Sequence, residues 1–307
     1  MVVVLIAANF IVVFPLHDPP GVMIRRHGTI LVATDFSAGA ARALERATRL
    51  PLADPAKLVL VHVLPADAKS SAQADAEELL AQTLTTVPRS PDLEISSEVA
   101  SGTPFEAIIK HARSLEADLV VMGRHGKRRI HDLLIGSTVH RTVRYGDTPV
   151  LVVNAEVTGP YRRPVIALEL DDVSRRIVEL GLSVLPSEIG EVDVVHANEL
   201  PATELQLIAS TGFEDDHDVG ARRFLEDVLH STGVAGSPWR ITIRRADARI
   251  AILNETVSYQ ADLVVLGTHG RSGLAHVAAG SVAEFVLGEA RCDVLVTRPT
   301  RFTFAMP

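Results

Sequence analysis

A glycine-containing loop occurs twice in this chain, each time after an apolar run. The first copy reads Asp118-Leu-Val-Val-Met-Gly-Arg-His-Gly126, and the second reads Asp262-Leu-Val-Val-Leu-Gly-Thr-His-Gly270. A Gly-Ser pair follows each copy at the same distance, at Gly136-Ser137 and Gly280-Ser281. Glycines let the backbone approach a ligand closely, and free amides at a helix start favour phosphate. The repeat therefore predicts two phosphate-binding loops and two domains.

Other chemistry near the loops is less well supported. The duplicated His125 and His269 suggest a metal or a catalytic role, but no further ligands occur at zinc spacing. The sequence has neither a Gly-x-x-x-x-Gly-Lys-Ser/Thr loop nor a Gly-x-Ser-x-Gly elbow. His62 and His196 end apolar runs, and we expect both to be core histidines. We expect binding and not catalysis, with no metal site.

The basic run Lys127-Arg128-Arg129 after the first loop has two readings. It screens phosphate charge, or it is a solvated basic turn, and the sequence favours neither. Only Arg271 holds the matching place in the second half.

The segments around the loops alternate between strand and helix patterns, which indicates parallel α/β units. In the first half we expect strands at 30–35, 58–63, 95–99, 119–122 and 149–153. We expect one helix capped by Ser37, a second over 72–85, a third starting at Pro104 and a fourth starting at Ser137. In the second of these helices, Leu79, Leu80 and Leu84 should face inward. In the second half we expect strands at 165–168, 192–196, 240–244, 263–266 and 294–296, with helices over 174–182, 219–229, 250–259 and from Ser281. The run Ser281-Val-Ala-Glu284 has the form of a capping box.

These patterns divide the chain of 307 residues into parts. We expect an N-terminal extension at 1–27, a first domain at 28–153, a linker at 154–164, a second domain at 165–299 and a tail at 300–307. The apolar start resembles a signal peptide or anchor, but it lacks a basic n-region and is short for a membrane span. Our hypothesis is that the native start is Met23.

Composition limits the function classes. The formal net charge is −8, so no broad nucleic-acid surface is expected. The only cysteine, Cys292, cannot support a disulfide framework, and we expect a buried structural thiol in a cytoplasmic protein.

The loops, the first-strand sequence Ala33-Thr34-Asp35 and the second-strand sequence Val61-His62-Val63 together resemble the universal stress protein family. The likeness covers nearly all of 29–299 and points to the subgroup with two such domains in one chain. It implies an α/β fold of two tandem five-stranded parallel-sheet sandwich domains, Rossmann-like and similar to adenine nucleotide alpha hydrolases. It also implies an internal pseudo-dimer paired through the last strands, 150–153 and 294–296.

Members with this glycine motif bind ATP, so the resemblance implies a set of ligand-binding positions. In the first half these are Ala33, Thr34, Asp35, Val63, Met122, Gly123, His125, Gly126, Gly136, Ser137 and Thr138. In the second half they are Asp171, Ala197, Leu266, Gly267, His269, Gly270, Gly280, Ser281 and Val282. The alternative for Asp35 is a turn or helix-start acid.

The second half departs from the pattern near its first strand. Asp171 keeps the spacing to the strand, whereas Asp172 keeps the spacing to Ser174, so the equivalent of Asp35 is ambiguous. Ala197 replaces Val63, and the second loop adds Gly273. The two sites are therefore expected to differ in affinity.

The resemblance implies a cytoplasmic stress-response protein with ATP or a related adenine nucleotide as a regulatory ligand, with or without Mg²⁺. The alternatives are a nucleotide-independent scaffold for protein partners and a slow adenine-nucleotide hydrolase. We expect no nucleic-acid or membrane partner, and a homodimer stays open.

Overall fold

The computed structural model describes residues 2–7, 10–15, 24–88, 90–124, 136–199, 216–233, 239–268 and 280–298. Two strands, β1 (Val2–Ala7) and β2 (Phe10–Pro15), pair antiparallel at the start of the chain. In the described part of the chain, no helix has the length and apolar character to span a bilayer.

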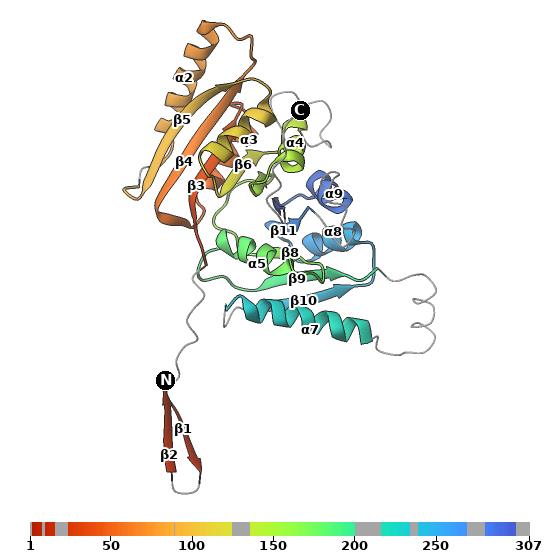
Figure 1. Ribbon diagram of the computed structural model, residues 1–307. Helices are drawn as coiled ribbons and strands as arrows, with labels where there is room; N and C mark the ends of the chain where they lie inside the picture. Colours follow the sequence, from red (N-terminus) through yellow and green to blue (C-terminus); the bar gives the residue numbers. More distant parts are fainter. Residues whose placement is uncertain are drawn as a thin grey trace.

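The rest of the fold is built on one ten-stranded sheet, in the order β10-β9-β8-β11-β12-β7-β6-β3-β4-β5 (Figure 1). The first half supplies β3 (His27–Thr34), β4 (Leu52–Leu64), β5 (Leu93–Ser101), β6 (Leu119–Gly123) and β7 (Val150–Val153). The second half supplies β8 (Pro164–Ala167), β9 (Val192–Ala197), β10 (Trp239–Arg244), β11 (Leu263–Gly267) and β12 (Asp293–Thr297). Within each half the five strands are parallel and follow the same order, so the sequence repeat is also a repeat of topology.

The two halves join through their last strands. β7 and β12 pair antiparallel, with Val152 opposite Val294 and Val150 opposite Val296. This pairing confirms the expected pseudo-dimer contact and makes the two five-stranded sheets continuous.

Helices cover both faces of the sheet. One face carries α1 (Ala38–Thr48), α2 (Ser70–Thr85), α5 (Ser174–Ser183) and α7 (Asp216–Ser231). The other face carries α3 (Pro104–Ser114), α4 (Ser137–Tyr145), α8 (Ala248–Ser258) and α9 (Ser281–Glu289). Figure 1 shows α2 beside β5 and α7 beside β10, at the two ends of the sheet. The fold is the α/β sandwich expected from the alternation of patterns.

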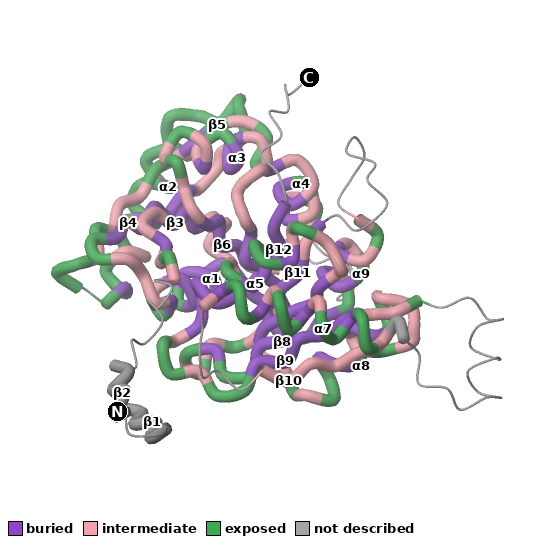
Figure 2. The backbone as a smooth tube through the Cα atoms, turned by 60° about the horizontal axis from the view of Figure 1, so that its bottom comes forward, coloured by how far each residue is buried: buried purple, intermediate pink, exposed green. Residues whose placement is uncertain are grey.

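The strands alternate between two apolar cores, because successive side chains point to opposite faces. Ile30 and Val32 contribute to the core under α1, whereas Leu31, between them, contributes to the core under α3. Each core contains residues of both halves. Figure 2 shows buried residues along the inner strands, whereas the edge strands β5 and β10 are mostly intermediate or exposed.

The segment between the domains is packed against both of them. Tyr161 is buried, and its hydroxyl donates to Asp293 Oδ2 at 2.7 Å. The same carboxylate accepts from Arg46 Nε of α1 at 3.1 Å and, through Oδ1, from the amides of Asn154 and Ala155. This buried network ties the first helix, the linker and the last strand together.

Most local signals in the sequence are confirmed. Ser37 caps α1 by accepting from the Ala40 amide at 3.2 Å, and Pro104 begins α3. One inward side chain was wrong, because Leu79 is 43% exposed while its neighbour Leu80 is buried.

Candidate functional site

In both halves the glycine motif lies at a topological switch point, where ligands of open parallel α/β sheets bind. The chain leaves the central strand β3 toward β4 on one side and returns through β6 on the other. The second half repeats this arrangement with β8, β9 and β11. The carboxyl ends of these strands therefore bring the first-strand, second-strand and glycine-loop positions to one edge of the sheet.

At the first switch point, Ala33 and Thr34 end β3, and Ala33 pairs with both Val61 and Met122. Asp35 follows, and its Oδ1 accepts from the Ser37 amide at 3.0 Å. Asp35 therefore has the helix-start role that was the alternative to ligand binding. It also lies at the edge of the sheet where a ligand would bind.

A histidine stabilises the strand end in each half. His62 Nδ1 bonds to the Thr34 carbonyl at 2.8 Å, and His196 Nδ1 bonds to the Leu168 carbonyl at 2.9 Å. A carbonyl only accepts, so Nδ1 is the donor in both rings. The expectation of a core histidine is confirmed for His196, which is buried, whereas His62 makes the same hydrogen bond but is only partly buried.

The first glycine of the first loop is required by packing. A Cβ built on Gly123 would lie 2.4 Å from the Gly39 carbonyl carbon and 2.9 Å from the Ala40 amide. Those atoms belong to the first turn of α1, so the glycine allows α1 to approach β6. The sequence had suggested a turn for ligand approach, and the structure gives a different reason for this glycine.

The base of each loop is closed by the same hydrogen bond. The Gly136 amide donates to the Arg124 carbonyl at 3.1 Å, and the Gly280 amide donates to the Thr268 carbonyl at 2.6 Å. The helices that follow, α4 and α9, have glycine N-caps without a side-chain capping bond. Backbone amides of their first turns are thus left for a ligand or for water.

The capping box proposed for α9 is wrong. The helix begins at Ser281 with Gly280 as its N-cap, so Ser281 is one residue too late to cap it. Glu284 instead contacts the other domain, where His140 Nε2 lies 3.0 Å from Glu284 Oε1. The capping-box motif predicted a contact within the helix, but Glu284 contacts His140 of the other domain.

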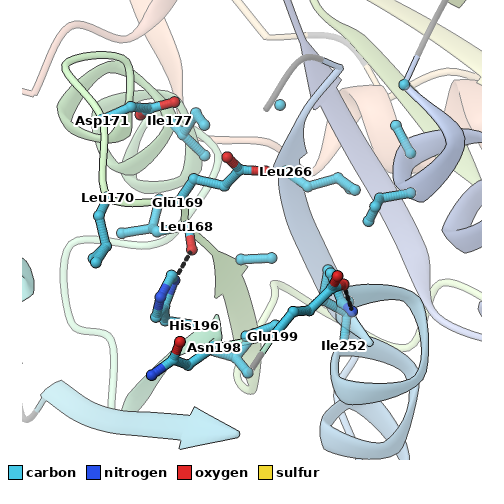
Figure 3. Close-up of a pocket in the computed structure, with 18 of the residues that line it drawn as sticks. Leu168, Glu169, Leu170, Asp171, Ile177, His196, Asn198, Glu199, Ile252 and Leu266 are labelled. Atoms are coloured by element: carbon cyan, nitrogen blue, oxygen red, sulfur yellow. Dashed lines mark hydrogen bonds between the residues drawn. The ribbon is translucent and has the colours of Figure 1, made fainter. Parts of the chain in front are cut away.

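A pocket of about 510 Å³ lies at the second switch point, within the size range of ligand-binding pockets. Figure 3 shows its polar residues, which come from the ends of β8 and β9 and the segments that follow them. The first turn of α9 forms another part of the wall, and α7 and α8 contribute Ala221, Ala248 and Ile252.

All described second-half positions that the resemblance implied lie in this pocket. They are Asp171, Ala197, Leu266, Gly267, Gly280, Ser281 and Val282. In the first half, the described positions lie at the ends of β3, β4 and β6 and at the start of α4: Ala33, Thr34, Asp35, Val63, Met122, Gly123, Gly136, Ser137 and Thr138. The positions His125, Gly126, His269 and Gly270 lie outside the described residues. A ligand role for any of the candidate positions in either half stays a prediction.

The strand register settles which acid matches Asp35. Ala33 pairs with Val61 as Ala167 pairs with Val195, so the residue two places after Ala167 is the match, and that residue is Glu169. The expected strand spacing of Asp171 is wrong, and Asp172 is not the match either.

Asp171 instead matches Asp35 on the helix side. Its Oδ1 accepts from the Val173 amide at 3.2 Å and from the Ser174 amide at 3.0 Å, just before α5. Counted from Ala33 and Ala167, which the register matches, the second half has two more residues before its helix, and the place of Asp35 is divided between two acids. Figure 3 shows the Glu169 side chain extending toward Leu266, with Asp171 beside α5.

Sequence reasoning missed further polar residues of the pocket, among them His196, Asn198 and Glu199. His196 is 6% exposed and lines the pocket together with Asn198 and Glu199. Asn198 Nδ2 donates to Asp218 Oδ1 at 3.0 Å, and Glu199 Oε1 accepts from the Ala248 amide at 2.8 Å. Asn198 and Glu199 are the second and third residues after the strand histidine His196, so their distance from that histidine in the sequence was the available signal.

The aspartate that opens each repeat lies at the opposite end of its strand from the ligand edge. Asp118 Oδ2 accepts from the amides of Gly28 and Thr29 at 2.8 and 3.0 Å. Asp262 accepts in the same way from the amides of Arg162 and Arg163. The duplication of this acid therefore reflects the start of the first strand and not the ligand.

Two further groups bear on the chemistry. Burial raises the pKa of Cys292 to about 12, so its thiol is a buried structural group, as expected. Among residues that the structure describes, no group of three or more His, Cys, Asp or Glu side chains has the arrangement of a metal site.

The fold and the site define two fused Rossmann-like α/β sandwich domains with a ligand-sized pocket at the second switch point. Solved structures share this arrangement. A universal stress protein from Archaeoglobus fulgidus DSM 4304 superposes with a TM-score of 0.66 at 18% identity, covering 89% of this chain and 99% of that one. A putative universal stress protein from Pseudomonas aeruginosa UCBPP-PA14 gives a TM-score of 0.63 at 18% identity, covering 90% and 94%.

Sequence comparison agrees with the fold. The model of the universal stress protein family matches residues 27–154 and again 160–298. A universal stress protein of Mycobacterium tuberculosis is 28% identical over 222 residues, which cover 67% of this chain and 70% of the relative. The chain belongs to the universal stress protein family, with two such domains in tandem.

Proposed function

We propose that this protein binds ATP or a related adenine nucleotide at its glycine loops and that the nucleotide is a regulatory ligand of a cytoplasmic stress protein. The observation that carries the proposal is the closed base of each loop. Gly136 and Gly280 each bond to the residue after the first loop glycine, directly before a helix whose first amides have no side-chain cap. That geometry suits an anionic phosphate.

A regulatory role needs a contact that the ligand can change. Arg124 provides one, because it follows Gly123 and its carbonyl closes the first loop. Its Nη1 donates to the Ala290 carbonyl at 3.0 Å and its Nη2 donates to the Gly288 carbonyl, both at the end of α9 in the second domain. A phosphate that moves the first loop would act on this interdomain contact.

We further propose that the protein is not an enzyme. The candidate acid Asp35 is engaged with the Ser37 amide, and the expected loop histidines have no shared acid or base beside them in sequence. Efficient phosphoryl transfer needs an oriented water and positioned charge. A steady-state assay of ADP release with Mg²⁺ tests this, and turnover above background would contradict it.

The binding proposal is tested by calorimetry on Gly126→Val. A valine in the first loop is expected to lower ATP affinity by at least about tenfold, since it blocks close approach of the backbone. Gly190→Val is the matched control, because Gly190 is exposed and no atom lies within 4 Å of its Cβ position. Unchanged ATP affinity in Gly126→Val would overturn the assignment.

The second candidate is a scaffold for protein partners whose loops bind no nucleotide. Protein denatured directly after native purification separates the two readings. Adenine nucleotide released and detected by chromatography supports the binding proposal, whereas none released and no ATP binding on titration favours the scaffold.

A further inference from the structure

We propose that the second pocket selects a nucleoside with at most one phosphate over ATP. The inference rests on the proposed function, since it names the ligand class of one of the two loop sites. Its basis is the chemistry of the pocket wall formed by the ends of β8 and β9 and the segments after them, where the second half differs from the first.

That wall is rich in hydrogen-bond acceptors. The carboxylates of Glu169, Asp171 and Glu199 all line the pocket, and none of the described lining residues is Lys or Arg. Three carboxylates within one pocket repel a triphosphate, which carries several negative charges. They attract ligand hydroxyl and amino groups, which donate hydrogen bonds to them.

His196 also lines the pocket and is 6% exposed, and its Nδ1 donates to the Leu168 carbonyl. In the neutral ring the other nitrogen, Nε2, is an acceptor, which a ligand N–H or O–H can satisfy. His62 makes the same Nδ1 bond in the first half, so this acceptor is common to both sites.

The first half lacks part of this acceptor wall. Because His62 and His196 make the same bond, the residues that follow them correspond: Leu64 matches Asn198, and Pro65 matches Glu199. The first site therefore has an apolar residue and a proline where the second has an amide and a carboxylate.

The helix end behind this wall is already neutralised. Glu199 accepts from the Ala248 amide, and Asp247 caps α8 by accepting from the Arg249 amide at 2.9 Å. In the first half α3 begins at Pro104 with no side-chain cap bond at Thr103. The start of α8 is thus closed to an anion, and only the first turn of α9 is left for one.

The first turn of α9 is a helix start at this pocket whose amides have no side-chain cap. The Gly280 amide is used by the Thr268 carbonyl, so the free amides begin at the exposed Ser281. In sequence, the loop before it contains Arg271, whereas the first loop contains Lys127, Arg128 and Arg129. The second site therefore has less positive charge to balance a triphosphate.

A bound Mg²⁺ would be the other use for several carboxylates. No group of three or more such side chains is arranged for a metal in the described ranges, so Mg²⁺ at this wall would need the ligand's own phosphate oxygens to complete its coordination. We assign the acceptor wall to ligand hydroxyl and amino groups, and binding measured with and without Mg²⁺ tests that assignment.

The test uses the full-length Gly126→Val variant, in which the first loop is disabled, with adenosine, AMP and ATP as separate probes. Calorimetry, with and without Mg²⁺, is expected to show adenosine or AMP binding at least about tenfold more tightly than ATP. Hydrogen exchange locates the event, and adenosine or AMP should protect residues 192–199.

Glu199→Gln sharpens the result, because the glutamine keeps an oxygen for the Ala248 amide and removes the charge. ATP affinity is expected to rise about fivefold, with adenosine affinity unchanged. Glu188→Gln, at an exposed position, is the matched control and should change neither.

Tighter ATP than adenosine and AMP binding at this pocket, or an unchanged ATP affinity in Glu199→Gln, would overturn the inference. If the intact protein binds ATP but neither adenosine nor AMP protects 192–199, the inference fails and the proposed function stands. If the intact protein binds none of the three probes, the proposed function itself fails.

Discussion

The two halves of this protein share one strand order and one loop closure, but they differ at the edge where a ligand would bind. The first half has Asp35 alone at the end of its first strand, and the second divides that place between Glu169 and Asp171. The first half has Pro65 after its second strand, and the second has Glu199. The two halves therefore share one backbone arrangement, but the second site has more acidic residues than the first.

The difference teaches that the glycine motif and the ligand wall are separate features. Loop closure depends on the hydrogen bonds of Gly136 and Gly280, which are the same in both halves. The proposed selectivity depends on Glu169, Asp171 and Glu199 in the wall of the second pocket, which the motif does not include.

The halves also differ in what fastens them together, and this gives the largest expected effect. Asp293 is fully buried at the start of β12, whereas the matching residue before β7 is Pro149. Asp293→Ala would leave Arg46, which is 4% exposed, without its ion-pair partner. We expect the free energy of unfolding to fall by about 3–5 kcal/mol, measured by denaturant titration.

Asp227→Ala on the exposed side of α7 is the control for that experiment and should change the free energy of unfolding by less than about 0.5 kcal/mol. A loss below about 1 kcal/mol in Asp293→Ala would contradict the assignment of Asp293 as the fastening residue.

A second prediction separates folding from ligand binding in the first loop. Gly123→Ala forces a Cβ to within 2.4 Å of the Gly39 carbonyl carbon, so α1 must move away from β6. We expect a loss of about 2 kcal/mol in the free energy of unfolding by thermal or chemical denaturation. Gly159→Ala is the control, because no atom lies within 4 Å of its Cβ position. Equal stability of the two variants would refute the packing role.

A third prediction concerns a buried acidic pair that only the second half contains. Desolvation raises the pKa of Asp193 to about 6, against the opposing effects of Thr242 and Arg240. Desolvation also acts on Glu255, but hydrogen bonds from Arg244 and Arg240 outweigh it, and the Glu255 pKa is lowered.

Because the folded protein holds the Asp193 proton more tightly than the unfolded chain, the resulting stability is present below about pH 4 and is lost as the pH rises through about 6. The free energy of unfolding of the native protein, minus that of Asp193→Asn, should therefore fall by about 2 kcal/mol between pH 4 and 7. Taking the difference cancels the titrating groups that do not interact with Asp193, and Glu255, which does, is an acid whose titration the substitution also changes. A flat difference over that range would refute the raised pKa.

The smallest effect is expected at the contact between matching positions of the two domains. His140 and Glu284 are each about a third exposed, with 3.0 Å between Nε2 and Oε1. A double-mutant cycle with alanine at both positions should give a coupling of about 0.5 kcal/mol, weaker at high salt. A coupling above about 2 kcal/mol would contradict the assignment of this pair as a weak, partly exposed contact.

Much of the fold could be predicted because apolar runs and helix caps are local signals. The five strands of each half, the Ser37 cap and the pairing of the last strands were all accessible from sequence and resemblance. The beginning of β4 at Leu52 was missed, because its first residues have no apolar pattern.

The candidate site was harder to predict where spacing alone had to decide. Three acids in the segment 169–172 concealed a two-residue longer connection before α5, and only the strand register identifies Glu169. The roles of Asp293 and Glu284 depend on partners far along the chain, 247 residues away for Arg46 and in the other domain for His140. No local pattern reports such contacts.

The most direct test of the account is the number of ATP molecules that one chain binds at saturation, measured by native mass spectrometry with calorimetry for affinity. Unequal sites predict one tightly bound ATP per chain, lost in Gly126→Val, with adenosine or AMP adding at the second pocket. Two ATP molecules of equal affinity, or one that persists in Gly126→Val, would contradict it.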